Sequence, residues 1–573
     1  MFRERCVRHK YSILFVLFLI CFYGYGIGRV YGFTFFPDEF GYWAHAAKAA
    51  GCDWSDIASR GSYYSYGYSM ILFPIFKLCT DAVTAYRAAV TLNFILIGAV
   101  YFMLLGLMKR PGGLTEDRSA LCAAVAAFYP CQLFYAKSTL AEPVLVALYA
   151  AICVLLCSYL EKNRRPALIG LVVALVYIHF VHMRAVGVLI AGILTLVSYL
   201  LTRTKGRRQL ALLLPVCAVA LAAGFAVKNR VQGGLYTDAA LSSINDYAGQ
   251  LEKLSYIFSR EGMRDFAEGL AGKLLYMGLS GFGLTWWGGL YAIKQTGRLV
   301  RALRRGQPYD ARGFLYVFIL LSAAGELLIN AIYNIHPLRV DSVVYGRYHE
   351  FVFPILMAFG MRELLSTASV WKGALAILLG QLPLTALAAD CVRRHGLTNM
   401  HGYVMAGMSY MHNAAHFEAG AFLWSAYGFG ALLTVVVVLA VTCVRENRRY
   451  EFLLTLLLVM ELALSARISG LYTDAAAQAT YRDTIIADKI EALAKEQPGR
   501  RIVYLSEEEW GFIGVLQFLL RDRKIELLPP EERTQAGEDD ILILYYESAF
   551  TQEAQERYRN HLLSGHFDIY YNR

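Results

Sequence analysis

Two adjacent carboxylates, Asp38 and Glu39, follow Pro37 soon after the first apolar stretch of the chain. Proline favours the first turn of a helix, and acidic side chains there are stabilised by the exposed backbone N–H groups. The pair therefore predicts a charge-matched helix start, with a helix that runs to about residue 50. It equally predicts a partly desolvated carboxylate that acts as a general base.

A third carboxylate, Glu142, lies directly before Pro143 in a turn between two apolar stretches. Acidic side chains at such depth are costly to bury and are therefore candidates for function. The alternative is a capping box, in which Thr139 and Glu142 satisfy N–H groups at the start of the second helix. The two interpretations are compatible with each other.

Two arginines in further turns could bind an anion. Arg184 follows His182 and Met183, and Arg347 precedes Tyr348, in each case just before an apolar stretch. The planar guanidinium group is well suited to phosphate oxygens. The alternatives are a side chain that extends toward the membrane surface and a salt bridge with a loop carboxylate.

The composition shows what kind of protein must position these residues. The chain has 573 residues, of which 57% are hydrophobic and 17% charged, and its mean hydropathy is +0.41. Soluble domains carry about 25% charged residues, so a soluble enzyme and a disordered chain are excluded. The 11 cysteines include no CxxC pair and lie mostly in apolar stretches, so we expect no disulfide framework.

Thirteen apolar stretches are candidate membrane-spanning helices, since about 20 residues cross a bilayer. The first follows a basic N-terminus with no small-residue cleavage site, so we expect an uncleaved helix. A further stretch, 66–79, is shorter and begins with several tyrosines, so we expect it to lie at the membrane surface. The thirteen are residues 11–30, 84–108, 119–136, 140–160, 166–181, 183–201, 209–227, 274–293, 313–333, 349–365, 371–389, 420–444 and 450–468.

Positive charge follows the pattern that this topology requires. With a cytoplasmic N-terminus, the inner segments hold 25 Lys and Arg in 69 residues, whereas the outer loops hold 15 in 152. This difference agrees with the positive-inside rule. The net charge of +10 is thus explained by topology, and no basic patch remains for nucleic acid. We expect a multi-pass protein of the plasma (cell) membrane.

The composition changes near residue 468, so we divide the chain into a transmembrane domain, 1–468, and a soluble domain, 469–573. The first outer loop, 31–83, belongs to the transmembrane domain. The tail carries 19 Asp and Glu against 12 Lys and Arg. An odd number of spans places it outside the cytoplasm, and alternating patterns predict a small α/β domain. The patterns are helical at 475–496, 507–520 and 551–563 and strand-like at 501–505, 524–528, 541–546 and 567–571.

The order of the turn motifs resembles that of GT-C-type polytopic membrane glycosyltransferases, the superfamily of protein O-mannosyltransferase-like and aminoarabinose-transferase-like enzymes. The resemblance covers about residues 1–365 and is poor over the last two helices. No Lys-Pro-Pro-like motif follows the first loop, so the donor sugar is not carried over from the aminoarabinose branch. The motifs are PDEFGY (37–42), YGYS (66–69) with FPIFKL (73–78), FYP (128–130), STLAEP (138–143), HMR (182–184) and GRY (346–348) with Pro354.

The resemblance implies an all-α, GT-C-like membrane protein of about 13 transmembrane helices with a small extracytoplasmic α/β domain. It further implies a glycosyltransferase that moves a sugar, with inversion, from a polyprenyl-phosphate-linked donor to an extracytoplasmic glycan, lipid or protein acceptor. Asp38 is then expected to be the catalytic base, with Glu39 beside it and Glu142 as a further acidic group.

The same resemblance implies a site for the donor phosphate and a set of substrate contacts. The residues expected at the phosphate are Arg184, Arg347, His182 and Tyr348. Those expected to contact substrate are Trp43, Tyr63 and Tyr64, whose alternative role is in the aromatic belt of the membrane interface.

Metal binding and two other functions stay open. No cofactor is assigned, and a divalent metal would require His412 and His416 to share a helix face near Glu418. An O-antigen-type polysaccharide polymerase or ligase would use the outer loop 228–273, whose basic residues alternate with acids. A lipid-linked-sugar transporter or flippase predicts inverted repeats and charges at mid-membrane, whereas charges here cluster at helix ends.

Overall fold

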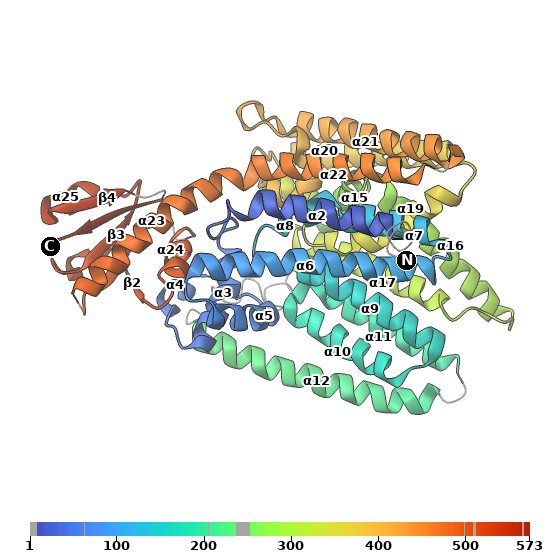
Figure 1. Cartoon of the computed structure of the whole chain (residues 1–573), viewed down its shortest axis with the longest axis horizontal. Coiled ribbons are helices and arrows are strands. Elements are labelled where there is room, and N and C mark those ends of the chain that lie inside the picture. The colour runs from blue at the N-terminus through green and yellow to red at the C-terminus, as the bar shows by residue number, and fades with distance from the viewer. Residues whose placement is uncertain are drawn as a thin grey trace.

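The apolar stretches form helices that lie side by side along the long axis of the molecule (Figure 1). Such segments become helices because a helix satisfies its own backbone N–H and C=O groups where no water can do so. The computed structural model describes residues 9–61, 63–203, 206–236, 253–447, 449–497, 499–507, 511–563 and 566–572.

Within these residues, nine helices are long and apolar enough to cross a membrane. The fold class is therefore the predicted polytopic helical protein. The nine are α2 (Lys10–Ile27), α6 (Ala82–Lys109), α9 (Glu142–Lys162), α11 (Val186–Leu201) with the turn η1 (Met183–Ala185), α12 (Gly206–Leu235), α17 (Gly313–Tyr333), α20 (Val370–Arg394), α21 (Ala419–Asn447) and α22 (Tyr450–Tyr472).

Two of the thirteen predicted spans are interrupted, which hydropathy averaged along the sequence does not reveal. The stretch 119–136 forms α7 (Glu116–Ala127) and α8 (Pro130–Tyr135), because a proline begins the second helix. The stretch 274–293 lies in α15 (Arg260–Ser280) and α16 (Leu284–Arg304). Phe282 and Gly283 between them both have positive φ, which ends the first helix.

Shorter helices complete the membrane domain. The stretch 66–79 forms α5, a helix of 13 residues whose position at the membrane surface remains a prediction. Together with α5 (Tyr66–Leu78), these helices are α3 (Asp38–Ala50), α4 (Ser55–Ser59), α10 (Arg165–Val181), α18 (Val340–Val344), η2 (Glu350–Val352), α19 (Phe353–Ser366), η3 (Gly402–Met411) and η4 (Ala414–His416).

Two acidic side chains lie in the middle of spanning helices, and here the prediction that charges cluster at helix ends is wrong. Glu326 of α17 and Glu461 of α22 are both almost fully buried. Glu326 accepts a hydrogen bond from the backbone N–H of Val188 at 3.1 Å, which links α17 to α11. Glu461 has no hydrogen-bond partner among the described residues.

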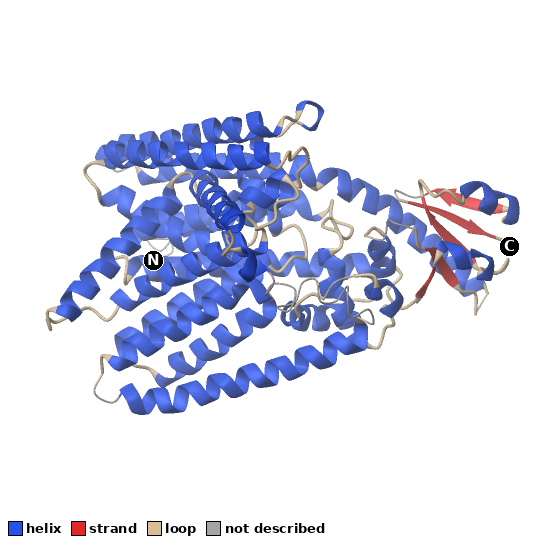
Figure 2. Cartoon of the chain, turned by 180° about the vertical axis from the view of Figure 1, so that it is seen from behind, coloured by secondary structure: helices blue, strands red, loops and turns tan. Residues whose placement is uncertain are grey.

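The C-terminal tail forms a five-stranded sheet at one end of the bundle (Figure 2). The strand order is β2-β1-β3-β5-β4, with β1 parallel to β2 and β3, and β5 antiparallel to β3 and β4. The strands are β1 (Ile502–Leu505), β2 (Ile525–Leu528), β3 (Ile541–Tyr545), β4 (Asn560–Leu563) and β5 (Phe567–Tyr571), and the helices are α23 (Asp474–Glu496), α24 (Ile513–Leu519), η5 (Pro530–Gln535) and α25 (Thr551–Arg557).

This domain is the predicted small α/β unit, with one local error. The predicted helix 551–563 ends at Arg557, and its last part is the strand β4. Only Thr473 separates α22 from α23, so a nearly continuous helical path leads from the bundle to the sheet. The first described residues and the C-terminus lie at opposite ends of the molecule (Figure 1). The boundary at residue 468 stays a prediction.

Candidate active site

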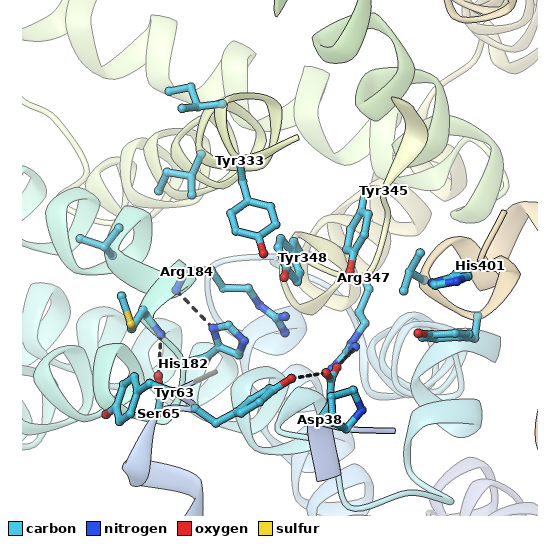
Figure 3. A pocket seen from close by; sticks show the side chains of 18 of the residues that line it. Asp38, Tyr63, Ser65, His182, Arg184, Tyr333, Tyr345, Arg347, Tyr348 and His401 are labelled. Atoms are coloured by element: carbon cyan, nitrogen blue, oxygen red, sulfur yellow. Dashed lines mark hydrogen bonds and ion pairs between the residues drawn. The ribbon is translucent and has the colours of Figure 1, made fainter. Parts of the chain in front are cut away.

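Asp38 begins helix α3 and faces a cavity of about 510 Å³ (Figure 3). Its side chain is 24% exposed. The hydroxyl of Tyr64 donates to Oδ1 at 2.6 Å, and Nη1 of Arg347 donates to Oδ2. Burial and the charge of Asp38 raise the pKa of Tyr64 well above its ordinary value, so this hydroxyl stays a donor. The carboxylate is thus held by one neutral donor and one cation.

Arg347 lies in a turn that is fixed on several sides. The backbone N–H groups of Gly346 and Arg347 both donate to the carbonyl of Val404, at 3.0 and 2.9 Å. Asn330 donates to the carbonyl of Tyr345 on the other side of the turn. Gly346 packs directly on the ring of Tyr276, where a Cβ atom would lie 2.0 Å from ring carbons. The guanidinium of Arg347 therefore reaches the cavity from a rigid support.

Glu142 joins the two arginines. It is the first residue of α9, and its Oε1 accepts from Nη2 of Arg184 at 2.8 Å and from Nε of Arg347 at 2.7 Å. The predicted capping box is wrong, because Thr139 makes no cap and instead donates to Glu39. Burial would lower the pKa of Arg347, but the charges of Glu142 and Asp38 hold it well above its ordinary value.

Arg184 has N–H groups that are not used in hydrogen bonds among the described residues. Only 6% of its surface is exposed, yet its Nε and Nη1 find no hydrogen-bond partner among the described residues. Its guanidinium lies over the ring of Tyr348, 4.8 Å from the centroid. Nδ1 of His182 accepts from the backbone N–H of Arg184 at 3.3 Å, and burial with the two nearby arginines lowers the pKa of His182 well below its ordinary value. An anion bound here would satisfy the spare N–H groups.

Glu39 is not among the residues that line the cavity, and its hydrogen bonds hold neighbouring segments together. It is fully buried and accepts from the backbone N–H groups of Thr34, Phe35 and Thr139, at 2.7 to 2.9 Å. The hydroxyls of Tyr86 and Thr139 donate to it as well, both at 2.6 Å. Burial raises the pKa of Glu39, against these hydrogen bonds. This carboxylate ties the first loop to α6 and to the turn before α9.

Of the three aromatic residues predicted to contact substrate, two line the cavity and one does not. Tyr63 and Tyr64 line the cavity, whereas Trp43 is fully buried behind it. The indole N–H of Trp43 donates to the hydroxyl of Thr139 at 2.9 Å, and its ring packs against Phe518 of the C-terminal domain. Trp43 therefore holds the first loop in place and does not reach the cavity.

His45, on the same helix, fixes Tyr64. Its Nε2 lies 2.9 Å from the carbonyl oxygen of Tyr64. Burial lowers the pKa of His45 to about 4, so near neutral pH the ring is uncharged and Nε2 is the donor. The chain His45–Tyr64–Asp38 thus orients the carboxylate from behind.

Sequence reasoning missed several cavity residues because they come from segments with no recognised motif. Tyr333 and Tyr345 stand beside Tyr348, and His401 lies beyond Arg347 (Figure 3). Arg339 lines the same cavity. An excess of tyrosine in the loops before α19 was the available signal. The full lining is Phe36, Pro37, Asp38, Tyr63, Tyr64, Ser65, His182, Met183, Arg184, Val186, Leu254, Ile329, Ile332, Tyr333, Arg339, Tyr345, Arg347, Tyr348, His401, Tyr403 and Val404.

Two kinds of side chain line the cavity. Some are ionic or aromatic side chains, and others are aliphatic side chains such as Val186, Ile329 and Ile332. A ligand with a charged head and an apolar chain would match both.

The proposed histidine face for a metal is not formed. His412 has an extended backbone, and His416 ends the 3-10 turn η4, so the two do not follow each other on one α-helix. Among the described residues, no group of three or more His, Cys, Asp or Glu side chains is placed to hold a metal ion.

Together, the helical bundle and the small C-terminal α/β domain define a polytopic, mainly helical membrane protein. Comparisons with protein-family models and with curated protein sequences find no match. Among solved structures, the chain is similar to ArnT from Cupriavidus metallidurans bound to undecaprenyl phosphate, with a TM-score of 0.55 and 15% sequence identity over 98% of each chain. For the apo state of ArnT the TM-score is 0.54 at 15% identity, over 98% of this chain and 97% of that one. At this identity the likeness shows a shared fold.

Proposed function

We propose that the protein is a membrane glycosyltransferase that takes a sugar from a polyprenyl-phosphate-linked donor and transfers it to an extracytoplasmic acceptor. One observation carries the proposal: Arg184, whose buried Nε and Nη1 have no hydrogen-bond partner among the described residues, lines a cavity that Asp38 also lines. The fold of ArnT, whose solved structure holds undecaprenyl phosphate, supports the same ligand class.

The donor phosphate would bind between Arg184 and Arg347. A phosphate there would accept charge-assisted hydrogen bonds from Nε and Nη1 of Arg184. These two nitrogens have no partner among the described residues. The prenyl chain would leave along the aliphatic side chains toward the bilayer. Arg347 is already paired with Asp38, so phosphate and Asp38 compete for Nη1 of Arg347.

Catalysis would use Asp38 as general base. Its carboxylate takes the proton from the acceptor hydroxyl while that oxygen attacks the anomeric carbon. The bond from the anomeric carbon to the phosphate oxygen breaks, and the electron pair leaves with the phosphate, whose charge the arginines stabilise. Attack from the face opposite the phosphate inverts the anomeric configuration. Arg347 released from Asp38 by the donor would leave the carboxylate free for this step.

The decisive experiment compares two arginines of the same cavity. Titration with undecaprenyl phosphate should show Arg184→Ala binding about 10- to 100-fold more weakly than wild type, the scale of one or two charge-assisted hydrogen bonds. Arg339→Ala is the matched control, because Arg339 is already paired twice with Asp341, at 3.0 Å each. Equal affinity of Arg184→Ala and wild type would contradict the donor site.

Turnover tests the remaining part of the proposal. Purified protein would be incubated with labelled polyprenyl-phospho-sugars and envelope acceptors, and the anomeric configuration of the product determined by NMR. We expect sugar transfer with inversion. Retention of configuration would contradict direct attack with Asp38 as base, and release of the sugar to water alone would contradict transfer.

A further inference from the structure

A second, much smaller cavity lies behind the arginine pair. Its volume is about 10 Å³, and Glu142, Gln132, Tyr129, Tyr135 and Glu350 are among the residues that line it. Glu142 is shared with the candidate active site, since its Oε1 accepts from both Arg184 and Arg347. Glu142 therefore links the small cavity to the two arginines that line the main cavity.

Four buried polar atoms around this cavity have no hydrogen-bond partner among the described residues. They are Oε2 of Glu142, Oε2 of Glu350, and both Oε1 and Nε2 of Gln132. A buried polar atom without a hydrogen-bond partner costs about 1–3 kcal/mol. We therefore expect the four atoms around this cavity to have a partner. A space of this size is about that of one water probe, and a buried water needs two to four polar partners.

Glu350 is placed to share such a water as a neutral acid. Only 4% of its surface is exposed, and it makes no ion pair among the described residues. Its Oε1 accepts from the hydroxyl of Tyr129 at 3.1 Å and from that of Tyr276. An unpaired charge at such a site is disfavoured, which favours the protonated carboxyl group, and this form can donate a hydrogen bond.

Glu350 also belongs to the turn that carries Arg347. Its backbone N–H donates to the carbonyl of Gly346 at 3.2 Å, one residue before the arginine. The side chain of Glu350 therefore anchors this turn to Tyr129 and Tyr276 from the side opposite the main cavity.

We propose that one water molecule occupies the small cavity and links Glu350 and Gln132 to the free oxygen of Glu142. The water donates to Oε2 of Glu142 and to Oε1 of Gln132, and it accepts from the Glu350 carboxyl. Glu350 and Gln132 are then positioning residues: they fix Glu142, which fixes the two arginines. The effect on the donor rests on the function proposed above, whereas the water does not.

The first test is direct. A high-resolution experimental structure of the full chain should show density for a single water within about 3 Å of Oε2 of Glu142. A dry cavity, or side-chain pairing that fills it, would overturn the proposal. This result is decisive even if the protein binds no polyprenyl phosphate.

The second test uses variants and undecaprenyl phosphate as the probe. Glu350→Gln should bind within about twofold of wild type, because the amide imitates a neutral carboxyl group. Glu350→Leu should bind about 10-fold more weakly, and Gln132→Leu should be affected in the same direction. Glu461→Leu is the control, since Glu461 is an equally buried acid of α22 that has no hydrogen-bond partner among the described residues.

Two outcomes would refute the positioning role. If Glu350→Leu lowers only the thermal midpoint while the folded fraction binds the probe normally, Glu350 is merely structural. If Glu350→Gln is as damaging as Glu350→Leu, the residue acts as a charge rather than as a neutral hydrogen-bonding group. A wild-type protein that does not bind the probe would instead refute the proposed function.

Discussion

Replacing Asp38 with asparagine is expected to separate chemistry from donor binding. Asparagine can still accept the Tyr64 hydroxyl through Oδ1, but its Nδ2 would face Nη1 of Arg347, donor against donor. Turnover should fall by about 10²- to 10⁴-fold, because the amide cannot take the acceptor proton. The affinity for undecaprenyl phosphate should rise at the same time. A charge-assisted hydrogen bond to Arg347, worth about 1.5–3 kcal/mol, no longer competes with the phosphate, so a gain of about 10-fold is expected.

The assay measures both quantities on one purified preparation. Binding would be followed by titration with undecaprenyl phosphate, and turnover by single-turnover transfer from a labelled donor. Asp53→Asn is the matched control, because it makes the same chemical change in the first loop, at a residue outside the cavity lining. Wild-type turnover in Asp38→Asn would refute the assignment of the base. Weaker donor binding would refute the competition between Asp38 and phosphate for Arg347.

Three further predictions concern stability and topology. Glu39→Gln should lower the thermal midpoint, because an amide group cannot accept hydrogen bonds at both of its terminal atoms as the carboxylate does. Protein that still folds should bind undecaprenyl phosphate normally, and loss of binding without loss of stability would contradict the structural role. Wild-type stability should fall as the pH drops from about 6.5 toward 4, by at most about 3 kcal/mol, because the unfolded state protonates His45 first. His45→Gln should flatten that part of the stability profile, and an unchanged slope would exclude His45 as its source. A cysteine introduced at Asn560 should react with a membrane-impermeant thiol reagent in intact cells, and protection there would place the C-terminal domain in the cytoplasm.

The fold could be predicted largely because hydropathy and charge are properties of whole segments. Apolar stretches and the positive-inside bias act over many residues, so local errors cancel. What could not be predicted depended on single residues. Phe282 and Gly283 end α15 through their backbone conformation, and the apolar composition continues unchanged across that break. Hydropathy also dilutes one acid among many apolar neighbours, which hid Glu461 in α22.

The candidate site was predictable in its residue types and less so in their roles. Asp38, Arg184 and Arg347 were found because charged side chains beside apolar helices demand a partner. Adjacent residues on a helix point in different directions, about 100° apart, so only one of Asp38 and Glu39 could face the same space. Which one did so was decided by Thr139, about 100 positions further along the chain, which donates to Glu39 and not to Asp38. No local pattern encodes such a choice.

The order of the charged residues along the chain has a consequence for biosynthesis. Glu142 and Arg184 are 42 positions apart and pair across α9 and the turn before α11, whereas Arg347 meets Asp38 over 309 positions. A chain made from its N-terminus can therefore neutralise Glu142 early, with helices that are already inserted. Asp38 can pair with Arg347 only after α17 and the following turn have left the ribosome. A nascent chain that stalls before that point lacks the cation that pairs with Asp38 in the complete chain.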